Sequence, residues 1–179
     1  MGISKYAQKM IFSGVMKLKE GKLKLSKTRA IILPTPFIAS FLEESYEENG
    51  EEIFDFMFNA GKNLAQDTVE RIAKDNNMGK REFLSKTIDS ANLLGIGKLE
   101  IVRVNFSSEV LEVSLSDSPL VEELGNSEIS EDLDRPFSLF LKGAVHGIGQ
   151  EIFDKEVDSE YISSEFMGDE RTKVKVESI

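Results

Sequence analysis

The only histidine of the chain, His146, lies between glycines in the segment GAVHGIGQEIF, and a carboxylate-rich segment follows it. An imidazole near carboxylates is a combination used for acid–base catalysis and for metal binding. A serine hydrolase would also need a nucleophile on a strand-to-helix elbow, and no such motif stands beside His146. We therefore predict no catalytic residue, and we interpret His146 either as a pocket residue or as an ordinary structural histidine.

Two groups of carboxylates could bind a hard cation or take part in acid–base chemistry. Their spacing places the first group on an outward helix face and the second on a polar outer strand, where charged side chains are usually solvated. We predict that neither group is a site. The groups are Glu43, Glu44, Glu47, Glu48, Glu51 and Glu52, and then Glu156, Asp158, Glu160, Glu165 and Asp169.

The chain contains no cysteine, which excludes disulfides, thiol nucleophiles and thiolate metal sites. With a single histidine, a zinc or haem site would need carboxylates or a partner chain for its other ligands. We therefore predict no metal and no cofactor.

Gly143 and Gly147 are four residues apart, so they share one face of the expected helix 136–154. Each glycine costs about 1 kcal/mol in a helix relative to alanine, so something must offset that cost. Close packing on another backbone is one explanation, and room for a ligand is the other. In both cases, a side chain at Gly147 should collide with its neighbour.

Twelve phenylalanines favour an apolar ligand over a polar substrate, although the same residues are also typical of a plain core. Phe54, Phe58, Phe137, Phe140 and Phe153 could line an apolar tunnel. The predicted ligand-binding residues are Phe54, Phe58, Gly61, Leu64, Phe140, Gly143, His146 and Gly147.

The 179 residues suit one domain, and the net charge of −10 argues against nucleic-acid binding. No apolar run is long enough to cross a bilayer, and no secretion signal is recognised at the start, so we expect a soluble, cytoplasmic protein. The first 29 residues carry eight Lys or Arg and one acid, Glu20. We expect this basic segment to lie on the acidic remainder of its own chain or of a second copy.

Hydrophobic periodicity predicts helices first, then two strands, a helix and two more strands. This order indicates an α+β domain, with helices packed on one face of a four-stranded antiparallel sheet. Phe37, Ile38, Phe41 and Leu42 should face inward, and the run AIIL at 30–33 should be buried. The expected elements are helices 4–18, 37–48, 51–77, 80–94 and 136–154, strands 98–106, 109–116, 156–166 and 171–177, a hairpin or extended segment before Pro34, and an acidic loop over 117–134.

Three segments carry a resemblance to a known family: RAIILP, FNAGKNLAQ and FLKGAVHGIGQEIF continuing into SEYISSEFMGDERTKVKV. Over residues 29–176 the chain resembles the 4-vinyl reductase domain, which shares its fold with transport-protein-particle (TRAPP) subunits and haem–nitric-oxide-binding domains. We expect a single domain over 1–179, in which residues 1–28 form a basic helix and extended arm and residues 29–176 the part that resembles this family. Many members carry paired cysteines near the closing turn, where this chain has Ser164 and Thr172, and hydroxyls do not replace thiolates as soft ligands.

What the resemblance implies about function is a non-catalytic module, not expected to be an enzyme, that binds or senses a small apolar ligand as a homodimer. A ligand-free scaffold resembling TRAPP subunits is the alternative, and an accessory role in tetrapyrrole reduction ranks last. Haem-binding members use a histidine in a different sequence setting, so His146 is not predicted to bind haem.

Overall fold

The chain divides into two compact units, Met1–Pro34 and Thr35–Ile179, in a computed structural model. The boundary falls after Pro34, whereas the sequence placed the end of the basic arm at residue 28; whether residues 1–179 act as one domain stays a prediction. The structure describes residues 16–19, 22–25, 28–74, 79–92, 95–124, 130–165 and 168–179.

The first unit contains a three-stranded antiparallel sheet of β1 (Met16–Lys19), β2 (Lys22–Leu25) and β3 (Thr28–Ala30). The alternating KLKL segment forms β2, as its period of two predicts. The helix predicted over 4–18 is wrong at its end, because residues 16–18 belong to β1, where MKLK has the same alternation; its residues 4–15 lie outside the described part.

The apolar run after β3 is exposed, contrary to its predicted burial. Ile31 and Ile32 are 78% and 81% exposed, and the run has no regular secondary structure. Pro34 and Pro36 have no N–H to donate to a neighbouring strand. Residues 31–34 therefore follow the end of β3 and do not form a central strand of a sheet.

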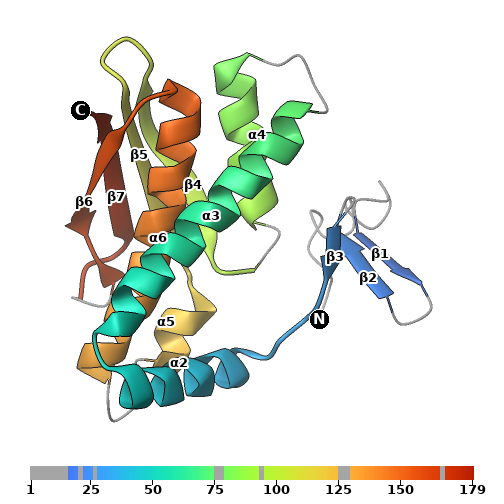
Figure 1. The fold of residues 1–179 in the computed structure, drawn as a ribbon, viewed down its shortest axis with the longest axis vertical. Helices are drawn as coiled ribbons and strands as arrows, with labels where there is room; N and C mark the ends of the chain where they lie inside the picture. Colours follow the sequence, from blue (N-terminus) through green and yellow to red (C-terminus); the bar gives the residue numbers. More distant parts are fainter. Residues whose placement is uncertain are drawn as a thin grey trace. The chain divides into compact units, whose positions relative to one another are not determined.

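The second unit packs helices on one face of a four-stranded antiparallel sheet, which confirms the predicted α+β class (Figure 1). In spatial order, the strands are β4 (Lys98–Asn105), β5 (Val110–Ser116), β7 (Thr172–Ser178) and β6 (Val157–Ser163). The helices are α2 (Thr35–Asn49), α3 (Glu52–Lys74), α4 (Lys80–Asn92), α5 (Pro119–Leu124) and α6 (Ser130–Phe153).

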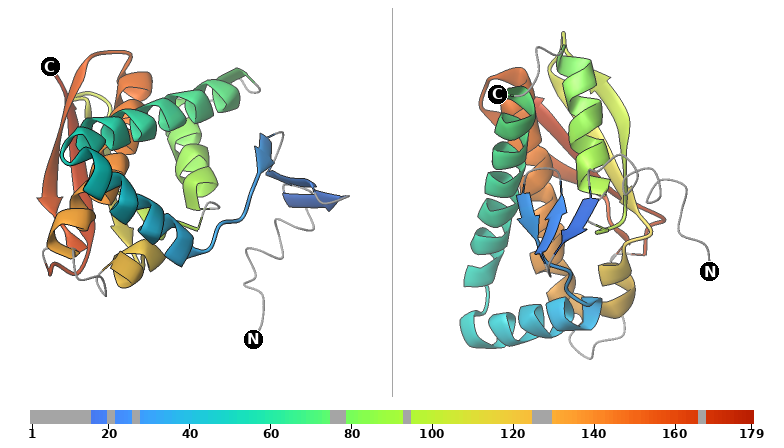
Figure 2. Two further views of the ribbon diagram at one scale, coloured as in Figure 1. Left: turned by 60° about the horizontal axis from the view of Figure 1, so that its bottom comes forward. Right: turned by 90° about the vertical axis from the view of Figure 1, so that its right-hand side faces the viewer.

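The inner face of the sheet carries the alternating apolar residues that the sequence predicts. Leu111, Val113 and Leu115 of β5 are at most 2% exposed, and Val174 and Val176 of β7 are fully buried. Helix α6 covers this face: a Cβ on Gly149 would lie 2.5 Å from the Val176 side chain. The views in Figures 1 and 2 agree that α6 lies between α3 and the sheet.

The Asn92 side chain connects the end of helix α4 to strand β4. Asn92 accepts a hydrogen bond from the Leu99 N–H (2.6 Å) and donates one to the Leu99 carbonyl (2.9 Å). Leu84 and Ile88 are buried on the same helix.

Two predictions about helix faces and ends are wrong. Phe37 and Phe41 are 57% and 56% exposed, because the buried stripe of α2 runs through Leu42, beside the partly buried Ile38 and Tyr46. The predicted loop 117–134 contains α5 and the start of α6, which begins at Ser130 and continues through Pro136. No helix in the described residues is long and apolar enough to cross a membrane.

Candidate functional site

The predicted site residues centre on the crossing of α3 and α6, where the two backbones touch. A Cβ on Gly143 would overlap the carbonyl oxygen of Phe58, and a Cβ on Gly61 would overlap that of Phe140. A Cβ on Gly147 would lie 2.6 Å from the Lys62 carbonyl oxygen. Each of these glycines therefore faces backbone of the opposing helix, which is the close-packing explanation of the glycine face.

The other predicted ligand contacts lie at different depths around this crossing. Phe54, Phe58 and Phe140 are partly buried, whereas Leu64 is 44% exposed and does not join the buried face of α3. Phe137 and Phe153 belong to the core. A ligand-binding role for these side chains stays a prediction.

His146 links three elements at the flank of the crossing. Its Nδ1 lies 3.2 Å from Ser159 Oγ on β6, and its ring meets the Phe58 ring of α3 edge-on, with centroids 5.2 Å apart. The imidazole is partly buried, and Ser159 is buried. In the part of the chain that the structure describes, Nε2 has no hydrogen-bond partner.

Burial is the main reason why the pKa of His146 lies below its ordinary value of 6.5, and the positive charge of Lys62 lowers this pKa further. The carboxylates of Glu156 and Asp158 raise the pKa, and Lys142 lowers it slightly. The ring is therefore neutral at pH 7, so one ring nitrogen donates a hydrogen bond and the other accepts one.

Hydrogen bonds close the turn between β6 and β7, which contains Ser164 and Asp169. The hydroxyl of the buried Thr172 accepts a bond from the Glu165 N–H (3.0 Å), and Asp169 Oδ2 accepts one from the Ser164 N–H (2.9 Å). Among the described residues, no three His, Asp or Glu side chains are grouped to hold a metal ion. Thr172 and Asp169 thus stabilise the turn through these hydrogen bonds.

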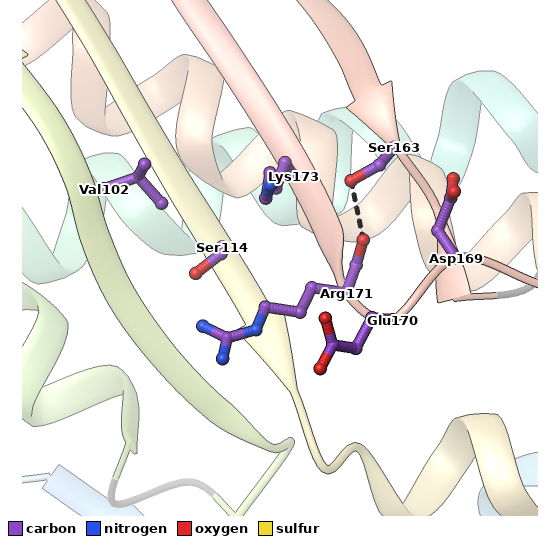
Figure 3. Close-up of a pocket in the computed structure, with 7 residues that line it drawn as sticks. All are labelled: Val102, Ser114, Ser163, Asp169, Glu170, Arg171 and Lys173. Carbon is purple, nitrogen blue, oxygen red and sulfur yellow. Dashed lines mark hydrogen bonds between the residues drawn. The ribbon is translucent and has the colours of Figure 1, made fainter.

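A cavity that the sequence did not indicate lies on the sheet near this turn (Figure 3). Its volume is about 430 Å³. The sequence did not single out Arg171 or Lys173, because a period of two does not show which residues of other strands lie beside them. The lining residues are Val102, Ser114, Ser163, Asp169, Glu170, Arg171 and Lys173.

Protonation of His146 should destabilise the native state. Because the folded-state pKa lies below that of the unfolded chain, the unfolded chain binds the proton more readily as pH falls below about 6.5. Urea unfolding between pH 7.5 and pH 5 should show the parent losing more stability than the neutral variant His146→Gln. Parallel pH profiles would show that the folded and unfolded chains bind this proton equally well.

Comparison with known proteins shows which solved structures share this fold. No family model matches the chain, and no curated protein matches it. The phenol-responsive sensory domain of the transcription activator PoxR, solved with phenol, is similar over 99% of this chain and 92% of its own, with a TM-score of 0.72 and 13% identity.

Two further solved structures are similar. A trafficking protein particle complex subunit 3 from Naegleria fowleri, covalently bound to palmitic acid, matches 80% of this chain and 93% of its own, with a TM-score of 0.57 and 11% identity. A vinyl-4-reductase family protein from Methanocaldococcus jannaschii matches 84% of each chain, with a TM-score of 0.49 and 18% identity. The chain thus has the fold of the PoxR sensory domain and of a TRAPP subunit, in agreement with the fold resemblance of its sequence.

Proposed function

We propose that this protein is a non-catalytic module that binds a small, mostly apolar molecule beside the α3–α6 crossing. The observation that carries the proposal is His146, a partly buried neutral imidazole against the Phe58 ring with Nε2 left without a partner in the described residues. An apolar wall with one convergent polar group is the usual composition of a small-molecule site.

The glycines define where such a ligand would lie. Backbone fills the space opposite Gly61, Gly143 and Gly147, so a ligand would contact the flank of the crossing, near Phe58 and His146. In this proposal, the glycines contribute by fixing the distance between the helices.

The fold comparison indicates which ligands to test at this site. The PoxR sensory domain is described as phenol-responsive, and the TRAPP subunit carries palmitic acid. A shared fold does not by itself transfer a function, so these neighbours select probes for binding experiments. Phenol suits the site best, because its hydroxyl can pair with Nε2 while its ring packs beside Phe58.

Phenol should bind with saturation in a calorimetric titration, with shifts of the His146 ring resonances by NMR. The variant His146→Phe should bind phenol about tenfold more weakly, because a hydrogen bond worth about 1–1.5 kcal/mol is lost. Ser90→Ala, which removes an exposed hydroxyl from α4, should bind like the parent. Equal affinity of the parent and His146→Phe would rule out this placement, and no saturable binding of phenol would contradict the proposal.

A homodimer is the second proposal, and the exposed side of α2 favours it. Phe37 and Phe41 are both more than half exposed and lie one helical turn apart. Helix α4 is not favoured as the dimer interface, because Leu84 and Ile88 are buried within the chain. An interface on the helix predicted over 4–18 would fall mainly outside the described residues.

Light scattering should give about twice the 20.0 kDa of one chain, and Phe41→Glu should reduce the mass to that of a monomer. Ile162→Glu, at an exposed apolar residue of β6, is the matched control and should stay dimeric. A parent that is monomeric at micromolar concentrations would exclude a stable homodimer.

A further inference from the structure

The cavity of about 430 Å³ lies on the face of the sheet that points away from α6 (Figure 3). Leu115 and Val113 of β5 and Val174 of β7 point toward the helices, so Ser114 and Lys173 between them point outward. The cavity is therefore separate from the His146 site and does not depend on the function proposed there.

Three side chains form a row across this face. Ser114 of β5 pairs directly with Lys173 of β7, and Lys173 pairs with Ser163 of β6. Neighbouring strands are about 4.8 Å apart, so a hydroxyl stands on each side of the lysine. Ser163 already donates its proton to the Arg171 carbonyl (2.7 Å), which leaves Ser114 as the available hydroxyl donor.

The Ser114 hydroxyl and the Lys173 ammonium have no protein partner in the described part of the chain. Ser114 is only 2% exposed, yet no hydrogen bond of its hydroxyl is found there, and Lys173 forms no ion pair. Lys175, two residues further along the same strand and face, pairs with both Glu160 (3.0 Å) and Glu177 (2.8 Å). Both groups line the cavity, so the hydroxyl and the ammonium are free to donate hydrogen bonds to an occupant.

The remaining lining residues limit the charge and shape of an occupant. Asp169 Oδ2 accepts a hydrogen bond from the Ser164 N–H, and Arg171 Nη1 forms an ion pair with Glu100 Oε2 at 3.4 Å. With Asp169 and Glu170 beside the cavity, a dianion would be repelled more strongly than a monoanion. Val102, 51% exposed, provides an apolar contact.

We propose that this cavity binds a small organic monocarboxylate. Its carboxylate accepts hydrogen bonds from Lys173 Nζ and Ser114 Oγ, and its apolar part packs on Val102. Charge-assisted bonds of this kind are roughly twice as strong as neutral ones, so the carboxylate supplies most of the affinity.

Benzoate is a suitable probe, titrated by NMR into the ¹⁵N-labelled full chain. Saturable shifts should centre on Ser114, Ser163 and Lys173, whereas benzamide, the neutral analogue, should not bind and phosphate should bind more weakly. Lys173→Gln should weaken benzoate binding about tenfold or more, and Ser114→Ala about threefold to tenfold. Lys175→Gln is the matched control and should leave the affinity unchanged.

The amide spectrum of each variant establishes that it is folded, and Lys173→Met replaces Lys173→Gln if the latter unfolds. The proposal is overturned if benzoate gives no saturable shifts, if benzamide binds equally well, or if the lysine variants at 173 and 175 have equal affinities. Benzoate shifts centred on Phe58 and His146 would also overturn it while leaving the phenol site intact.

Discussion

The backbones of α3 and α6 touch at Gly61, Gly143 and Gly147, and the rest of the second unit is arranged around this contact. A glycine in a helix costs about 1 kcal/mol relative to alanine, and the many dispersion contacts of a close backbone approach offset that cost. With α3 on one side, α6 presents Val145 and Ile152 as buried residues on its other sides. Helix α6 packs on the inner residues of β5 and β7.

The same arrangement separates two chemically different surfaces. The side chain of His146 contacts Phe58 of α3 and Ser159 of β6. Burial lowers the pKa of this imidazole and keeps it neutral. The outer face of the sheet carries charged residues, and there Ser114 and Lys173 lie side by side. An apolar hydroxyl compound suits the first surface, and a carboxylate suits the second.

Local periodicity predicted the parts of the fold that depend on local pattern. Hydrophobic periodicity predicted the strands 109–116 and 171–177 of a sheet with one face under the helices, and the spacing of Gly143 and Gly147 identified a helix face. What lies opposite depends on long-range packing, so the sequence favoured close packing but did not exclude ligand space. Phe37 was misplaced because a wide apolar helix face does not show which stripe is buried. The outer cavity was missed because its residues meet only through the registers of separate strands.

The most direct test of the helix contact is the free energy of unfolding of Gly143→Ala, measured by urea denaturation. Because the added Cβ would overlap the Phe58 carbonyl oxygen, we expect a loss of about 1–3 kcal/mol or more. Gly79→Ala is the control: no atom lies within 4 Å of its added Cβ, and its effect should stay within about 0.5 kcal/mol. If Gly143→Ala is instead as stable as the parent, or gains up to about 1 kcal/mol from helix propensity, the two backbones do not touch and the account is wrong.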